Sequence, residues 1–387
     1  MTIIRFPTPA RPLRIAFAGG GTGGHVCPAV AVAEAAAEER PGSEVLFLGT
    51  DRAVERRILS HAGLPHVALP AAPLRGGRGL LAQVRALLAA RAHLRRFAPD
   101  VVLGLGGFAS APGVLAARTL GVPVALFEPN AVAGRANQLL ARLARVACVH
   151  WPELALPCPV ARTGAPLGQA VARGLALTSG EARHALGLPP GAPTLLVMGG
   201  SQGARALNEW LQVGLPAALP AGPPPSFIHL TGSEAAVAPL QEAYRAAGAA
   251  HRVLPFLNEV GLAYRAADLA IVRGGAATLA ELAACGLPGL VVPLPSSAGD
   301  HQRANARAFA AQGAGRVLEE AALSGEALGA ALRLLRAREE LAGMRASALA
   351  AGRPRAARTV LRVMEQLAGA RTDGVGAAPG SNRTRAA

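Results

Sequence analysis

The chain has 387 residues, of which 51% are hydrophobic and 16% charged, so we expect two domains of roughly 150–200 residues with large buried sheets. All 39 basic residues are arginine and the net charge of +15 favours anionic partners, but only 3% of residues are aromatic and no nucleic-acid motif appears, which argues against nucleic acid. The cysteines lack C-x-x-C spacing, so neither a zinc site nor a disulfide framework is indicated. We find no apolar leader and no uninterrupted apolar span, so we expect no signal peptide, no membrane-spanning helix and a cytoplasmic location.

The first predicted unit is an apolar strand at Arg14–Ala18, a glycine-rich turn at 19–24 and a helix. The turn has the spacing G-x-G-x-x-G, and Asp51 follows the next predicted strand, so a dinucleotide site is one interpretation. A P-loop is excluded because no Lys-Ser/Thr pair follows the glycines. His25 enters the helix, where its imidazole either accepts a proton from a sugar hydroxyl or merely caps the helix.

A basic segment follows, since residues 56–99 contain arginines but no acidic residue. Apolar side chains recur within it near helical spacing, which predicts an amphipathic helix. This helix either rests on anionic lipid headgroups or packs on the core with solvated arginines, and we expect a mixture of the two. The apolar residues are Leu80, Leu81, Val84, Leu87 and Leu88, and the arginines are Arg75, Arg78, Arg85 and Arg91.

Three further strands are predicted at Val101–Gly104, Leu195–Met198 and Leu269–Val272, each closely followed by a Gly-Gly pair. Short continuous apolar runs are typical of parallel strands buried on both faces, and ligands bind at the carboxyl ends of such strands. Any α/β chain repeats such turns, but two pairs in the same order favour two similar domains with glycine turns lining a cleft between them. We expect the hinge at 162–171 and a surface loop at 219–227.

The turn "MGGSQGARALNE" is a second candidate anion site. Ser201, Gln202 and the amides of Gly203 and Ala204 can hold a diphosphate at the start of the next helix, unless this is an ordinary tight turn.

Polar residues after the last of these strands suit a sugar nucleotide. Thr278 and Glu281 share one helix face, where the carboxylate accepts ribose hydroxyls or serves as a favourable charge near the helix start. In "GDHQRANA", Gln302 suits sugar hydroxyls because an amide both donates and accepts, and a solvated polar loop is the alternative. No Asp-x-Asp occurs, so we expect no metal and no cofactor, with helix dipoles and amides stabilising the diphosphate.

Taken together, "GGGTGGH", "PDVVLGLGGFASAP", "MGGSQGARALN", "RGGAATLAELAACGLP" and "DHQRANA" resemble the MurG family, the bacterial UDP-N-acetylglucosamine transferases of cell-wall synthesis in glycosyltransferase family 28. The resemblance runs from about Ile15 to Gly315. It implies the GT-B fold, in which two Rossmann-like, doubly wound parallel-sheet α/β domains face each other across a cleft. The implied parts are an acceptor- and membrane-facing domain (1–165), a UDP-GlcNAc-binding domain (166–350), a helix returning to the first domain (351–368) and a disordered tail (369–387).

The resemblance also implies an activity, an inverting transfer of GlcNAc from UDP-GlcNAc to the C4 hydroxyl of MurNAc in lipid I. His25 is then the candidate base, and Glu128 an orienting or alternative partner. The implied partners are the two substrates, the anionic cytoplasmic leaflet of the plasma membrane, where the enzyme is peripheral, and proteins of cell-wall synthesis and division. The implied substrate contacts are Thr22, Gly23, Gly24, Asn130, Ser201, Gln202, Gly203, Ala204, Leu257 (uracil), Gly275, Ala276, Thr278, Leu279, Glu281 (ribose) and Gln302.

Two motifs depart from the family pattern. "H-E-Q-N" reads "FEPN" here, with Phe127 and Pro129 in place of His and Gln. "G-N-P-V-R" reads "GAPLG", so Gly168 replaces an arginine expected at the donor, for which Arg162 or Arg173 are candidate substitutes. These losses leave a non-catalytic UDP-sugar-binding homologue as one alternative. An NAD-dependent oxidoreductase that uses the turn 19–24 and Asp51 is another.

Overall fold

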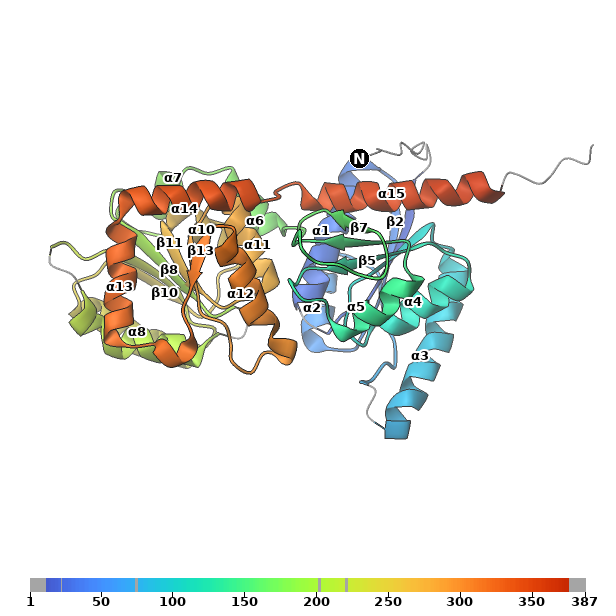
Figure 1. Cartoon of the computed structure of the whole chain (residues 1–387), viewed down its shortest axis with the longest axis horizontal. Coiled ribbons are helices and arrows are strands. Elements are labelled where there is room, and N and C mark those ends of the chain that lie inside the picture. The colour runs from blue at the N-terminus through green and yellow to red at the C-terminus, as the bar shows by residue number, and fades with distance from the viewer. Residues whose placement is uncertain (1–11, 22, 74–75, 201–202, 220–221, 376–387) are drawn as a thin grey trace, which may run out of the picture.

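Two parallel β-sheets form two α/β domains that lie side by side in the computed structural model (Figure 1). The structure describes residues 12–21, 23–73, 76–200, 203–219 and 222–375. The first sheet has the order β3-β2-β1-β4-β5-β6-β7 and the second the order β10-β9-β8-β11-β12-β13. The predicted pair of doubly wound parallel-sheet domains is therefore confirmed.

The strands of the first sheet are β1 (Arg14–Ala18), β2 (Glu44–Gly49), β3 (His66–Ala68), β4 (Val101–Gly104), β5 (Val124–Glu128), β6 (Val146–Val149) and β7 (Val160–Arg162). Those of the second are β8 (Thr194–Met198), β9 (Ser226–Leu230), β10 (His251–Leu254), β11 (Leu269–Val272), β12 (Gly289–Val291) and β13 (Gly315–Val317). All residues of β4, β5, β8, β9 and β11 are buried, as expected for parallel strands covered on both faces. The predicted loop 219–227 is wrong at its end, because β9 begins at Ser226.

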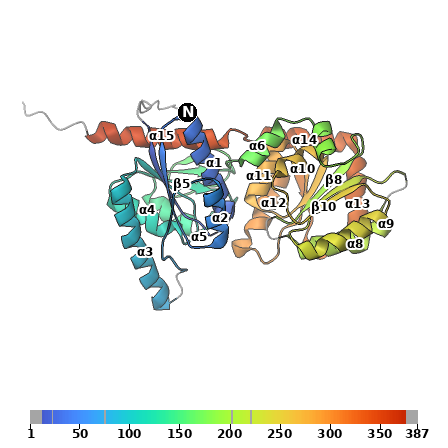
Figure 2. The same cartoon turned by 180° about the vertical axis from the view of Figure 1, so that it is seen from behind.

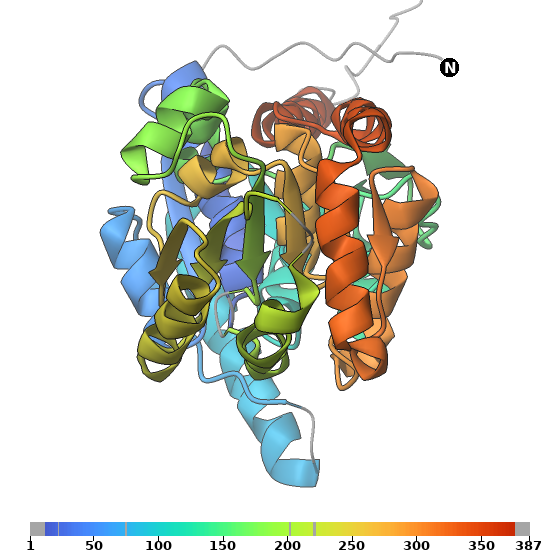
Figure 3. The same ribbon diagram turned by 90° about the vertical axis from the view of Figure 1, so that its left-hand side faces the viewer.

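Helices cover both faces of each sheet (Figure 3). In the first domain they are α1 (Gly23–Glu39), α2 (Ala53–His61), α3 (Gly76–Phe97), α4 (Ser110–Thr119), α5 (Arg135–Leu140) and the short η1 (Ala141–Leu143). The second domain contains α6 (Gln169–Leu175), α7 (Ser179–Ala185), α8 (Arg205–Ala218), η2 (Glu234–Ala236), α9 (Val237–Ala246), α10 (Val260–Ala266), α11 (Ala276–Cys285), η3 (Ala298–Asp300), α12 (His301–Ala311), η4 (Glu320–Ala322), α13 (Gly325–Arg336) and α14 (Arg338–Ala351). Among the described residues, no helix combines the length and apolar character that crossing a bilayer requires.

The two sheets share one topology, which predicts where ligands bind. Numbered within its own domain, each sheet has the core order 3-2-1-4-5-6, and the first adds β7 at its edge. In such sheets the strand order reverses between the first and fourth strands, and ligands bind at the carboxyl ends on either side of this point. Two of the four glycine turns follow β1 and β4, and the other two follow β8 and β11.

The last helix, α15 (Ala356–Val375), lies along the first domain beside α1 although it follows the second domain in sequence (Figures 1 and 2). Its apolar face packs into the first-domain core, and Glu365 pairs with Arg40 at 2.7 Å. The predicted tail, 369–387, overlaps the end of this helix, and residues 376–387 lie outside the described part of the chain. The domain boundaries proposed above remain predictions.

Candidate active site

The glycine turn between β1 and α1 is held by a buried carboxylate that the sequence analysis did not single out. Gly19 and Gly21 have φ angles of 140° and 94°, a region that favours glycine. Glu55 of α2 is fully buried and accepts hydrogen bonds from the amide of Gly21 at 2.8 Å and from the amide and hydroxyl of Thr50 at 2.8 and 2.7 Å. The conformation of the turn therefore depends on a partner inside the same domain.

This arrangement argues against a dinucleotide site. Asp51, the candidate ribose acid, is exposed and pairs with Arg56 at 3.1 Å. A dinucleotide fold uses the amides of its glycine turn to bind pyrophosphate. Here the amide of Gly21 donates to Glu55 instead, and that buried negative charge repels a pyrophosphate.

His25, the candidate base, lies half-buried in the first turn of α1. It sits beside the turn after β4, since a Cβ atom on Gly107 would lie 3.8 Å from the imidazole Cε1. Burial lowers the pKa of His25, and the negative charges of Glu128 and Glu55 oppose this only in part. The imidazole is therefore neutral at pH 7 and competent to accept a proton.

Glu128, the last residue of β5, is a buried carboxylate with both oxygens engaged. Oε1 accepts from the amide and the side chain of Asn130 at 3.0 and 2.9 Å. Oε2 accepts from the amide of Gly134 at 2.9 Å and the side chain of Asn137 at 3.0 Å. Each oxygen thus accepts two hydrogen bonds from the protein, so the geometry favours the orienting role of Glu128 over the alternative base.

Asn305 of α12 joins the two domains through its side chain. Its Oδ1 accepts from the amide of Ala131 at 2.8 Å, and its Nδ2 donates to Oδ1 of Asn130 at 3.1 Å. The same Nδ2 donates to the carbonyl of Gly274 at 3.1 Å, in the turn after β11. Asn305 is only 1% exposed, so these bonds are shielded from water and Asn130 is oriented from both domains. Asn305 lies in the motif "DHQRANA", and the motif alone predicts no role for it.

The glycine turn after β8 is tightly packed. Gly200 and Gly203 have φ angles of 84° and 70°, and a Cβ atom on Gly203 would lie 2.4 Å from the carbonyl oxygen of Thr231. The amide of Gly203, predicted to bind a diphosphate, already donates to the carbonyl of Gly200 at 2.9 Å. Ala204 directly precedes α8, whose N-terminal dipole favours an anion.

Three buried polar side chains, joined by hydrogen bonds, lie next to this turn. The side chain of Asn208 donates to the carbonyl of Thr231 at 3.1 Å, so its Oδ1 must accept from Nε2 of His229 at 3.0 Å. The other ring nitrogen then accepts from the hydroxyl of Tyr244 at 2.9 Å. Burial lowers the pKa of His229 to about 3, consistent with a neutral ring that donates on one side and accepts on the other.

Some predicted contacts are described only in part or not at all. Thr22, Ser201 and Gln202 lie outside the described residues, and Gly23 and Gly24 are the first two residues of α1.

Glu281 of α11 is half-buried, and its Oε2 accepts from the hydroxyl of Tyr264 at 2.7 Å. Burial raises the pKa of Glu281 to about 7, although the bond from Tyr264 acts in the opposite direction. Burial raises the pKa of the Cys27 thiol to about 11, and the negative charge of Glu281 adds to this effect. Cys27 lies on α1, so α1 of the first domain faces α11 of the second. Thr278 lies half-buried on the same helix face, near Gly275. The remaining predicted contacts on α11 are Ala276 and Leu279, both buried.

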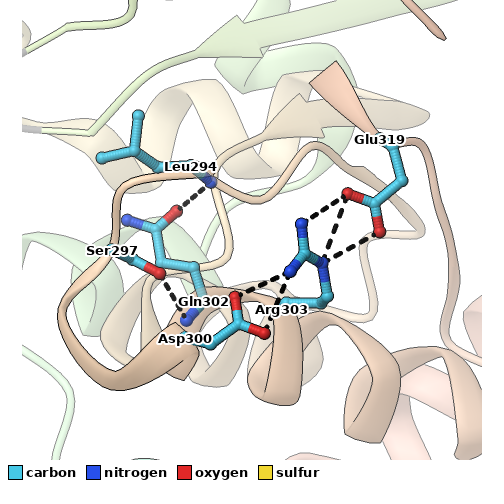
Figure 4. Close-up of polar contacts among 6 residues, drawn as sticks. All are labelled: Leu294, Ser297, Asp300, Gln302, Arg303 and Glu319. Atoms are coloured by element: carbon cyan, nitrogen blue, oxygen red, sulfur yellow. Dashed lines mark hydrogen bonds and ion pairs between the residues drawn. The ribbon is translucent and has the colours of Figure 1, made fainter. Parts of the chain in front are cut away.

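Gln302, near the start of α12, is fixed by the backbone around it (Figure 4). Its Oε1 accepts from the amides of Leu294 at 3.0 Å and Gly274 at 3.2 Å. Because both partners are N–H donors, the side-chain orientation is determined, and Nε2 is the atom left to donate. If Gln302 contacts a sugar hydroxyl as expected, it does so by donating a hydrogen bond from Nε2.

An arginine beside Gln302 ties the start of α12 to the strand end next to it (Figure 4). Arg303 donates to Asp300 through Nη1 at 3.0 Å and to Glu319 through Nε at 3.1 Å. A solvated, unstructured loop is therefore not what the sequence "GDHQRANA" forms.

Among the described residues, neither candidate arginine is seen to replace the one expected at position 168. Gly168 precedes α6, and a Cβ atom there would meet nothing within 4 Å. The guanidinium of Arg173 is engaged by Glu259 at 2.7 and 2.9 Å, and Arg162 is exposed at the end of β7. Leu257, the expected uracil contact, lies after β10 and packs against the second-domain core.

Paired Rossmann-like domains, with polar residues from both meeting at their junction, are the architecture of the GT-B fold. Residues 15–149 match the model of the glycosyltransferase family 28 N-terminal domain, and residues 194–360 match that of the C-terminal domain. The chain belongs to glycosyltransferase family 28.

Two similar proteins carry the name UDP-N-acetylglucosamine–N-acetylmuramyl-(pentapeptide) pyrophosphoryl-undecaprenol N-acetylglucosamine transferase. The protein of that name from Halorhodospira halophila is 42% identical over 347 residues, covering 88% of this chain and 94% of the relative. The one from Syntrophotalea carbinolica is 39% identical over 354 residues, covering 88% and 95%.

Solved structures agree with this assignment. The crystal structure of MurG from Acinetobacter baumannii has a TM-score of 0.76 at 31% identity, covering 92% of this chain and 100% of that one. UDP-GlcNAc 2-epimerase from Neisseria meningitidis, bound to UDP-GlcNAc, has a TM-score of 0.62 at 14% identity, covering 91% and 99%, a likeness of fold alone.

Proposed function

We propose that this chain transfers GlcNAc from UDP-GlcNAc to the C4 hydroxyl of MurNAc in lipid I, inverting the anomeric carbon and forming lipid II. The observation that carries the proposal is Asn305, which bonds the loop after β5 to the turn after β11. The first of these elements belongs to the domain of His25, and the second to the domain of Glu281. A base from one domain and donor contacts from the other are what a two-substrate transfer requires.

The second domain is proposed to bind the donor. Glu281 accepts the ribose hydroxyls, the backbone of Leu257 reads the uracil edge, and Nε2 of Gln302 donates to a sugar hydroxyl. The diphosphate lies near the start of α8, where Ala204 and the helix dipole stabilise negative charge. This charge grows on UDP as the anomeric C–O bond breaks, so the dipole favours the transition state more than the ground state.

The first domain is proposed to supply the base. Neutral His25 takes the proton of the C4 hydroxyl while that oxygen forms a bond to the anomeric carbon, opposite the departing UDP. The negative charge of Glu128 favours the imidazolium that results, since it acts to raise the pKa of His25. Asn130, held by Glu128 and Asn305, is proposed to contact the donor sugar.

Transfer of radiolabelled GlcNAc to a lipid I analogue tests the proposal. We expect the wild type to form a β-linked disaccharide product, and His25→Ala to lose about 10²- to 10⁴-fold in kcat with donor binding retained. Glu281→Ala is expected to raise the donor KM. A wild type that binds UDP-GlcNAc and forms no product would support the non-catalytic alternative instead.

We further propose that α3 rests on the anionic cytoplasmic leaflet, where lipid I resides. This helix extends beyond the rest of the first domain (Figure 1), and its apolar stripe, Leu80, Leu81, Val84 and Leu88, is 45–63% exposed. The opposite stripe, Ala86, Ala90 and Leu94, is buried, so the exposed residues are not needed for the core. Exposed arginines flank the stripe at Arg85, Arg95 and Arg96.

Vesicle flotation tests this second proposal. The wild type is expected to bind vesicles with phosphatidylglycerol and to be released by salt, because headgroup attraction is screened. Replacing Leu80, Leu81 and Leu88 by Ser should reduce binding without loss of folding, since these side chains are exposed. Unchanged flotation of that variant would contradict the proposal.

A further inference from the structure

The backbone of Gly21 is held by hydrogen bonds at both its amide and its carbonyl. Its amide donates to Oε2 of Glu55 at 2.8 Å, and its carbonyl accepts from Nη1 of Arg52 at 2.9 Å. Both partners come from the segment between β2 and the first turn of α2. The turn that precedes His25 is therefore fixed by side chains and not only by its own glycines.

Glu55 is built into the domain as a buried charge. Its carboxylate is completely shielded from solvent, accepts three hydrogen bonds from Gly21 and Thr50, and lies 3.3 Å from Nε2 of His66. A carboxylate is costly to bury without hydrogen-bond partners, and these donors offset that cost.

The neighbouring glycines leave space for this carboxylate. A Cβ atom on Gly20 would lie 2.4 Å from Oε2 of Glu55, and one on Gly49 would lie 1.6 Å from Oε1. Gly20 does not have a positive φ angle, so its lack of a side chain is explained by the carboxylate and not by backbone conformation. The turn and Glu55 therefore form one unit, with the charge directly beneath the loop.

We propose that Glu55 is a positioning residue for the transfer reaction, which fixes the turn that carries His25 and stabilises the imidazolium formed when His25 takes the proton. This inference rests on the proposed function. Glu55 does not reach the substrates; it acts through Gly21 and through its electric field.

Glu128 is the other charge that shifts the pKa of His25. It acts in the same direction as Glu55, raising the pKa against the lowering effect of burial. Arg52 lies on the outer side of the turn, bonded to the Gly21 carbonyl. His66 faces Glu55 and not His25. Removing the charge of Glu55 should therefore lower the pKa of His25 while Glu128 maintains part of the effect.

The test compares Glu55→Gln with Asp51→Asn in the full chain. Both variants remove one negative charge near the same turn, but Asp51 is exposed and pairs with Arg56. NMR titration of the histidine ring signals, assigned to His25 by its loss in His25→Ala, is expected to give a lower pKa in Glu55→Gln and the wild-type pKa in Asp51→Asn. In the transfer assay, Glu55→Gln is expected to lose about tenfold or more in kcat with the donor KM unchanged.

An unchanged His25 titration in folded Glu55→Gln, or a rise in donor KM without loss of kcat, would overturn the inference. Should Glu55→Gln fail to fold, Arg52→Ala tests the hydrogen bond to the Gly21 carbonyl. This variant is expected to fold because the side chain of Arg52 is exposed. We expect kcat to fall about two- to tenfold, the contribution of one hydrogen bond, with no downward shift of the His25 pKa. A wild-type kcat in Arg52→Ala would contradict the claim that side-chain hydrogen bonds to Gly21 position His25. The titration requires no substrate, so its result is separable from a failure of the proposed activity.

Discussion

At the scale of single residues, burial determines the protonation states that the account requires. Burial lowers the pKa of His25 and raises the pKa of Glu281 to about 7. The directions differ because desolvation disfavours the charged form, which is the protonated form of a histidine and the deprotonated form of a carboxyl group. The imidazole is thus ready to accept a proton at neutral pH. The carboxylate of Glu281 changes its charge within the working range.

A pH dependence of donor binding follows from Glu281. Below pH 7 the carboxyl is protonated and loses acceptor capacity for the ribose hydroxyls, so the KM for UDP-GlcNAc should rise several-fold from pH 8 to pH 6. The diphosphate of the donor stays ionised throughout this range, so it does not contribute to the change in KM. Glu281→Gln should show a raised KM without this pH dependence, whereas a flat wild-type profile would be evidence against a titrating Glu281 in donor binding.

At the scale of elements, the sequence predicted the framework better than the contacts between its parts. The strands were recognisable because each is a continuous apolar run ending in glycines. The roles of Glu55 and Asn305 were not recognisable, because each depends on partners brought together only by folding. For Asn305 these partners, Ala131 and Gly274, lie far from it in sequence and in different domains.

Asn305→Ala should therefore loosen the junction more than the fold of either domain. It leaves the half-buried amide of Ala131 and the buried carbonyl of Gly274 without their partners, and a buried unsatisfied group costs about 1–3 kcal/mol. Hydrogen exchange is expected to increase in the loop 129–134 after β5. Asn208→Ala is the matched control, since Asn208 is also a buried asparagine but bonds only within the second domain. Equal exchange in both variants at 129–134 would exclude the bridging role.

At the scale of the whole molecule, the two domains are packed into each other and connected twice. Trp151 of the first domain belongs to the core cluster of the second, and Ala280 of the second belongs to a core cluster of the first. The chain crosses once between β7 and α6 and again between α14 and α15. These crossings touch, because a Cβ atom on Gly164 would lie 2.4 Å from Cβ of Arg353.

Gly164→Ala should consequently destabilise the protein by about 1–3 kcal/mol, since it adds an atom at this contact and places alanine at a φ angle of 82°. Gly168→Ala, four residues further along the same crossing, has open space and should change stability by less than about 1 kcal/mol. Chemical denaturation of both variants measures the difference. Similar midpoints would show that the two crossings are not in contact in solution.

The central claim is that one reaction site is shared by the two domains. A crystal structure of the protein with UDP-GlcNAc tests it most directly. We expect the ribose within hydrogen-bonding distance of Glu281, the diphosphate at the start of α8, and the anomeric carbon directed toward His25. A nucleotide bound instead in the turn between β1 and α1, with Glu281 unoccupied, would contradict the account.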